Sequence, residues 1–172
     1  MTHPLISIFS IEAFRLQVQP DRFIIETHNE IHFELISDLV IGAFSLLEST
    51  PVSSMGVNRM MHFKMDSVEG WHAFGDKIAP KDIWHGIIKK SGLLSLTMMD
   101  PREKSDNYIR VKIEPSKKVN PGVLIDINNH FTVKDDSMQT MAQVMVGILK
   151  ESFEKFLGQS KEMALGLMEK GK

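Results

Sequence analysis

Residues 107–133 read NYIRVKIEPSKKVNPGVLIDINNHFTV, and this stretch decides the fold. Apolar side chains alternate with Arg110, Lys112 and Glu114 in its first half, and with polar side chains again in its second half. Alternation with a period of two is typical of a strand that buries one face. Because Pro121-Gly122 indicates a turn between the halves, the stretch predicts antiparallel strands at 107–114 and 122–133.

Shorter segments with the same alternation predict further strands. They are residues 93–99 and 53–65, a hairpin over residues 12–28 that turns at Pro20-Asp21, and a short edge strand over residues 5–9. Arg59 falls on the apolar face of the 53–65 strand, where an unpaired charge would be costly. It is therefore expected either to pair with a buried carboxylate or to mark the exposed start of the strand.

Four segments predict helices. Residues 31–48 are apolar over most of the helix circumference, with Asn29 placed as a cap, so this helix is expected to be buried. Two short helices are expected, one carrying Trp71, Phe74 and Ile78 and one running from Ile83 to Ile88. A long helix is expected over about 137–169. We therefore predict a single α+β domain over residues 1–172: a mostly antiparallel sheet of about six strands packed with a central apolar helix, two short helices and a long C-terminal helix.

The C-terminal helix is long for a chain of this size. At about 1.5 Å per residue it would span roughly 45–50 Å, more than the width of a compact domain. It is expected either to bend near Gly158 or to project from the domain. Since projection would leave apolar residues in need of a partner, the sequence predicts a homodimer.

The composition narrows the function classes. The chain has 172 residues, 42% of them hydrophobic, a net charge of −2 and no cysteine. The weak charge argues against nucleic acid as a partner, and the missing cysteines exclude disulfides and iron–sulfur clusters. The first residues lack the basic start of a signal peptide, and the apolar run 39–47 is too short for a membrane span. We expect a cytoplasmic protein with no membrane association.

Candidate site residues lie in the alternating strands. They are His62, Arg110, Asp126, Asn128 and His130. Three interpretations are open: the solvated face of an antiparallel sheet, a surface for a ligand or partner, or a catalytic pair in which a carboxylate orients an imidazole.

No cofactor and no metal site are predicted. The sequence holds no Gly-rich phosphate loop, no nucleophile elbow and no HExxH motif. His28 and His32 have the spacing of metal ligands on a helix. However, Asn29 as the cap places His28 before the helix, so a polar strand–helix junction is the favoured interpretation.

Short patches of the sequence resemble an uncharacterised family of bacterial proteins, from about Phe9 onward. The patches are Thr50-Pro51-Val52, Gly56-Val57-Asn58, Trp71-His72, Ala79-Pro80-Lys81, Trp84, Glu114-Pro115-Ser116 and Asn128-Asn129-His130. The resemblance implies a bacterial, cytoplasmic protein with an α+β fold. It assigns no activity and no functional residue.

The leading functional hypothesis is a non-catalytic binding or assembly protein that acts as a homodimer. The alternative is an enzyme of hot-dog type acting on a small molecule or acyl group, in which a sheet wraps the helix at 31–48. In that case His32, Glu34 and Asp38 would be the residues to suspect. Nucleic-acid binding is the third hypothesis.

Overall fold

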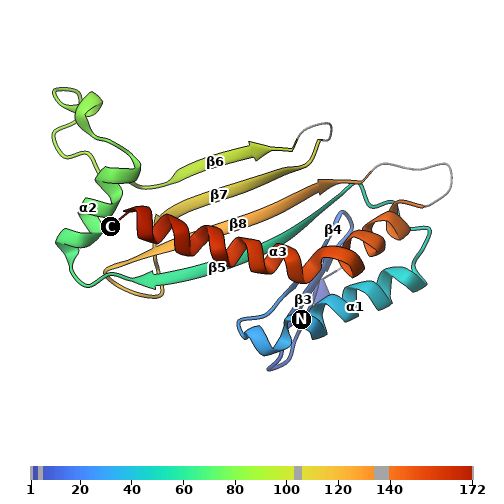
Figure 1. The fold of residues 1–172 in the computed structure, drawn as a ribbon. Coiled ribbons are helices and arrows are strands. Elements are labelled where there is room, and N and C mark those ends of the chain that lie inside the picture. The colour runs from blue at the N-terminus through green and yellow to red at the C-terminus, as the bar shows by residue number, and fades with distance from the viewer. Residues whose placement is uncertain (1, 4–5, 103–105, 134–139, 172) are drawn as a thin grey trace. The chain divides into compact units, whose positions relative to one another are not determined.

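The computed structural model describes residues 2–3, 6–102, 106–133 and 140–171 of the chain (Figure 1). It confirms an α+β protein with antiparallel sheets. The chain forms two compact units: unit 1 comprises Met1–Ser53 and Val133–Phe153, and unit 2 comprises Ser54–Thr132 and Glu154–Lys172. One sheet of about six strands was expected, but each unit builds its own sheet: β1 to β4 pair with one another through local turns, whereas β8 pairs with the distant β5 in the second sheet.

Unit 1 contains a four-stranded antiparallel sheet. Its strands follow the chain in the order β1 (Thr2–His3), β2 (Ile6–Ser10), β3 (Arg15–Gln19) and β4 (Arg22–Glu26). The predicted hairpin is confirmed, with Gln19 opposite Arg22 across its turn. Arg15 donates to Glu26 at 2.9 Å on the exposed side of this pair.

The predicted helix after the hairpin is also confirmed. A 3₁₀ turn, Glu30–His32, leads into α1 (Phe33–Leu46), and the Asn29 side chain caps the turn by accepting from the Ile31 N–H at 3.1 Å. Its expected burial is wrong. Phe44 packs edge-on against Phe23 of β4, but Leu46 is 87% exposed. The helix touches its sheet along a narrow stripe, so most of its apolar circumference is not used within unit 1.

Unit 2 is built on a second four-stranded antiparallel sheet. Its spatial order is β5-β8-β7-β6, with bounds β5 (Ser54–Lys64), β6 (Leu96–Pro101), β7 (Tyr108–Pro115) and β8 (Gly122–Thr132). All four strands were predicted. The two longest, β5 and β8, pair over their full eleven residues, from Ser54 opposite Thr132 to Lys64 opposite Gly122. The strand at 53–65 therefore lies beside the last strand of the sheet.

One face of this sheet carries the core of unit 2. Ile125 and Ile127 are fully buried there, together with Ala164 and Met168 of the C-terminal helix. Arg59 lies on the same face and is buried, and its guanidinium donates to the Leu157 backbone carbonyl at 3.1 Å. The exposed-start alternative for Arg59 is therefore wrong, because the strand continues on both sides of it.

Two elements follow β5. Ser67 caps α2 (Val68–Ile78) by accepting from the Gly70 N–H at 3.0 Å, and Phe74 is buried in the core. The second predicted short helix reduces to one 3₁₀ turn, Asp82–Trp84. Trp84 is exposed, because the turn ends before its apolar residues can repeat on one face.

The long C-terminal helix is confirmed as α3 (Met141–Gly171), while residues 137–139 of the expected helix lie outside the described residues. Its first part belongs to unit 1 and buries Met145 and Leu149, and its later part belongs to unit 2 and buries Phe156 and Ala164. Apart from Leu165, which is 45% exposed, the apolar residues of this helix are therefore at least partly covered within the chain. This removes the helix-based reason for expecting a homodimer. No helix in the described part of the chain has the length and apolar character needed to cross a bilayer.

Candidate functional site

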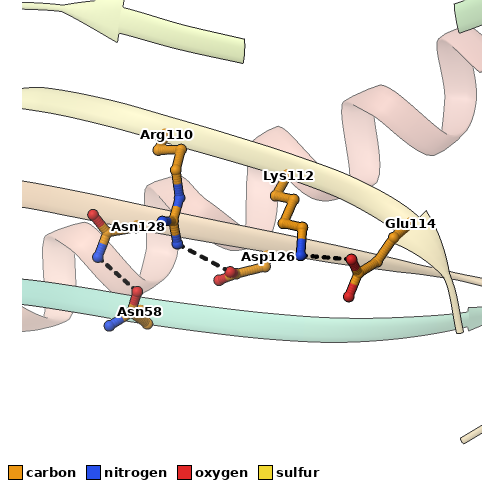
Figure 2. A network of polar contacts seen from close by, with 6 residues as sticks. All are labelled: Asn58, Arg110, Lys112, Glu114, Asp126 and Asn128. Atoms are coloured by element: carbon orange, nitrogen blue, oxygen red, sulfur yellow. Dashed lines mark hydrogen bonds and ion pairs between the residues drawn. The ribbon is translucent and has the colours of Figure 1, made fainter. Parts of the chain in front are cut away.

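The five candidate residues gather on one face of the unit 2 sheet, opposite the face that packs on α3. Partners across an antiparallel pair share a face, and the register places Arg110 opposite Asn128, and Tyr108 opposite His130. We call this the polar face, and Figure 2 shows its central side chains on the side of the sheet away from α3. It comprises Asn58, Met60 and His62 of β5, Met99 of β6, Tyr108, Arg110, Lys112 and Glu114 of β7, and Asp126, Asn128 and His130 of β8.

Asp126 is the central ionisable group of the polar face. Its Oδ2 accepts from Arg110 Nη2 at 3.2 Å, and the residue is only 8% exposed. Burial raises the pKa of the Asp126 carboxyl, although the positive charges of Arg110 and Lys112 oppose the shift. Asp126 Oδ1 and Arg110 Nε are buried and have no hydrogen-bond partner among the described residues. The interpretation of this row as a fully solvated face is therefore wrong at its centre.

Two asparagines join β5 to β8 beside this pair. Asn128 Nδ2 donates to Asn58 Oδ1 at 2.6 Å (Figure 2). Gly56, two residues before Asn58, leaves room for this contact, because a Cβ there would lie 2.6 Å from Asn128 Nδ2. The buried amide at 128 thus depends on a glycine in the neighbouring strand.

A second ion pair runs along β7. Lys112 Nζ and Glu114 Oε2 are 2.6 Å apart, and both side chains are partly shielded from solvent. The pair lies next to Asp126, since Lys112 faces Asp126 across β7 and β8. Lys112 lowers the pKa of the Asp126 carboxyl and Glu114 raises it, so the two charges of this pair act on the carboxyl in opposite directions.

The two histidines make separate contacts. His62 Nδ1 lies 2.8 Å from Ser116 Oγ, and partial burial together with the Lys118 charge lowers the pKa of the His62 imidazole. The His130 ring stacks on Tyr108 with 4.4 Å between centroids. Neither imidazole is oriented by a carboxylate in these contacts.

The spacing on β8 bears on the catalytic interpretation. Asp126 and His130 are four residues apart on one strand, about 13 Å at roughly 3.3 Å per residue. A carboxylate orients an imidazole base only through a hydrogen bond between them, which this spacing does not provide. The polar face can supply hydrogen bonds and charge to a bound group, but these two residues do not form a general-base pair.

Sequence reasoning missed two features of unit 2. Met60 and Met99 are 63% and 61% exposed on the polar face, and neither is among the predicted site residues. On the opposite face, Asn129 is buried and links Arg102, which donates to it at 3.2 Å, to Ser160 of α3 at 3.1 Å. The alternation of side chains along β8 could have revealed Asn129. Because Asn128 lies on the polar face, the next residue, Asn129, must lie on the opposite face, toward α3.

The structure also describes a small pocket beside α2. Its volume is about 90 Å³, and Trp71, His72, Lys81 and Leu93 are among its lining residues. Ligand pockets usually have volumes of about 300–1,000 Å³, so this one suits a group of only a few atoms. Among the described residues there is no cluster of three or more His, Asp or Glu that could hold a metal ion.

Comparison of the chain with protein-family models, curated proteins and solved structures finds no match.

Proposed function

We propose that the protein is a non-catalytic binding and assembly protein of the bacterial cytoplasm that works as a homodimer and presents the polar face to a partner. One observation carries the proposal. The charged and amide groups of the polar face are already bonded to one another, while Met60 and Met99 project from among them.

Such a face suits recognition for a physical reason. Binding a polar surface is costly when its charged groups must give up water without a compensating partner. Here Arg110 and Asp126, and Lys112 and Glu114, already compensate each other. The exposed methionines supply adaptable apolar contact to a partner. The distance of about 13 Å between Asp126 and His130 along β8 argues against a catalytic pair of these two residues, because it excludes a hydrogen bond between them.

The alternative of a hot-dog enzyme has no comparable support. It needs a helix wrapped by a sheet, whereas α1 leaves Leu46 and Leu35 exposed, and Glu34 and Asp38 lie on its exposed surface. Nucleic-acid binding finds no support in the polar face, because its two cationic side chains, Arg110 and Lys112, each pair with a carboxylate.

Light scattering tests the homodimer, with a protomer mass of 19.5 kDa. We expect twice this mass at micromolar concentration, and a protomer mass at all concentrations would contradict the proposal.

Affinity capture from a bacterial lysate tests the polar face. A partner held by the wild type should be lost by Met60→Lys, which places a charge on the part of the polar face that β5 contributes. A partner that both proteins retain with equal yield would show that the polar face is not the binding surface.

A further inference from the structure

Strand β6 forms one edge of the unit 2 sheet and is unusually exposed. In the part of the chain that the structure describes, β7 is the only strand that pairs with it, and five of its six residues are exposed. Met98 and Met99 are each 61% exposed, on opposite faces of the strand. Exposed apolar edge strands attract other strands, and proteins commonly protect them with charges. Asp100 is the sole charge within β6.

The backbone groups that β6 presents outward follow from its register with β7. Arg102 N–H donates to the Asn107 carbonyl at 2.9 Å, which makes this a hydrogen-bonded pair in continuation of the strands. Hydrogen-bonded and non-bonded pairs alternate along an antiparallel ladder. Thr97 and Met99 therefore direct their N–H and C=O groups away from β7, whereas Pro101, the next outward residue, has no N–H to offer.

The segment that precedes β6 in the chain also exposes apolar side chains. Between residues 82 and 95 the large apolar side chains that the structure exposes are Ile83, Trp84, Ile87, Ile88 and Leu94. This segment runs directly into Leu96, the first residue of β6. An exposed apolar surface continuous with an unpaired edge is a common feature of interfaces between proteins.

We propose that two copies of this chain pair through β6, antiparallel and in register about Met98, so that their two four-stranded sheets become one of eight strands. The inference rests on the homodimer proposed above and names its interface. In this register Thr97 of each copy faces Met99 of the other. Every outward N–H between Leu96 and Pro101 then finds a carbonyl, which makes four hydrogen bonds across the seam.

Self-pairing satisfies the outward N–H groups of this edge, and the position of Asp100 favours this register. A self-pairing strand centres on one residue, because partners across an antiparallel pair share a face. A centre at Asp100 would set two carboxylates opposite each other, and a centre at Met99 would leave them diagonal neighbours. The centre at Met98 places Asp100 opposite Leu96 of the other copy, with the two carboxylates roughly 13 Å apart along the strands.

Cysteine cross-linking tests the register, because the chain contains no other cysteine. Positions 98 would form a non-hydrogen-bonded pair with Cα atoms about 4.5 Å apart, within the range of a disulfide. Positions 99 would lie about 8 Å apart, beyond that range. Under mild oxidation we expect Met98→Cys to become a covalent dimer on a non-reducing gel and Met99→Cys to remain largely a monomer. Equal cross-linking of both, or of neither, would overturn the register.

Charge substitution tests the interface itself. Met98→Lys and Met98→Asp should each weaken dimerisation at least tenfold, and an equimolar mixture should restore it, because opposite charges then meet at the two-fold axis. Met60→Lys is the matched control: the same residue type, equally exposed, at the opposite edge of the sheet. It should dimerise like the wild type.

The outcomes separate this inference from the proposed function. A wild type that stays monomeric up to 100 µM would contradict both. A dimeric wild type whose association Met98→Lys leaves unchanged would retain the homodimer and overturn the β6 interface. A dimer lost in Met60→Lys but kept in Met98→Lys would place the seam on the polar face instead.

Discussion

The division of the unit 2 sheet into a buried and an exposed face is tested most strongly at Ile127. This residue is fully buried on β8, the strand between β5 and β7. Ile127→Ala removes three carbon atoms from this position. The lost transfer free energy is about 2.4 kcal/mol at ~0.8 kcal/mol per methylene. The residual cavity adds to this cost, because the strands on either side cannot close over it. We expect the free energy of unfolding to fall by about 3–4 kcal/mol.

Urea unfolding followed by tryptophan fluorescence measures this change. Both tryptophans, Trp71 and Trp84, lie in unit 2 and therefore report on the sheet that contains Ile127. With a slope of about 2 kcal/mol per molar urea, the midpoint should fall by roughly 1.5–2 M. A single transition with an unchanged slope would assign the loss to the folded core.

Met60→Ala serves as the control on the opposite face of the same sheet. Met60 lies opposite Asp126, one position along from Ile127, but most of its side chain is in solvent. Its truncation should change the free energy of unfolding by less than about 0.5 kcal/mol. Equal losses for Ile127→Ala and Met60→Ala would refute the assignment of a buried and an exposed face.

Three further outcomes follow from the contacts of unit 2. Burial raises the pKa of Asp126, so the contribution of its protonated carboxyl to stability is present below about pH 3.9 and is lost as the pH rises through the raised pKa. Asp126→Asn should therefore gain stability relative to the wild type between pH 4 and pH 8. A difference in urea midpoints that stays constant over this range would contradict the prediction. Ser67→Ala removes the cap of α2 and should cost about 1 kcal/mol, whereas an unchanged midpoint would show that the cap is not stabilising. Partial burial and the Lys118 charge lower the pKa of His62, so Lys118→Gln should raise it in an NMR titration while Lys117→Gln leaves it unchanged, and equal effects of the two would rule out a specific contribution from Lys118.

Most strands of the fold were predictable because each has a local alternation of apolar and polar side chains. The alternation of Ile125 and Ile127 with Asp126 and Asn128 determines which side chains share a face, whatever the sheet packs against. The turn at Pro121-Gly122 then makes the pairing of β7 with β8 nearly obligatory. The five candidate site residues were found from this alternation alone.

Burial was harder to predict, because it depends on what covers a surface. The helix at 33–46 has the composition of a buried helix, yet only Ser37 and Phe44 are buried in it. The row on β8 has the composition of a solvated face, yet the long side chains of Arg110 and Lys112 shield Asp126 from water. In both cases burial depends on how far the neighbouring side chains cover the surface, which the alternation along one segment does not specify.

The sequence by itself determined most of the helices and strands, the face of the sheet toward which each strand residue projects and the absence of cysteine chemistry, since these follow from the order of side chains along the backbone. Only the tertiary structure decided that the strands divide into two sheets, that Arg59 is buried beside the Leu157 carbonyl and that β6 is left at an edge. These features depend on pairings between residues far apart in the chain. Local periodicity is the same whichever partner a strand finds, so it cannot specify them.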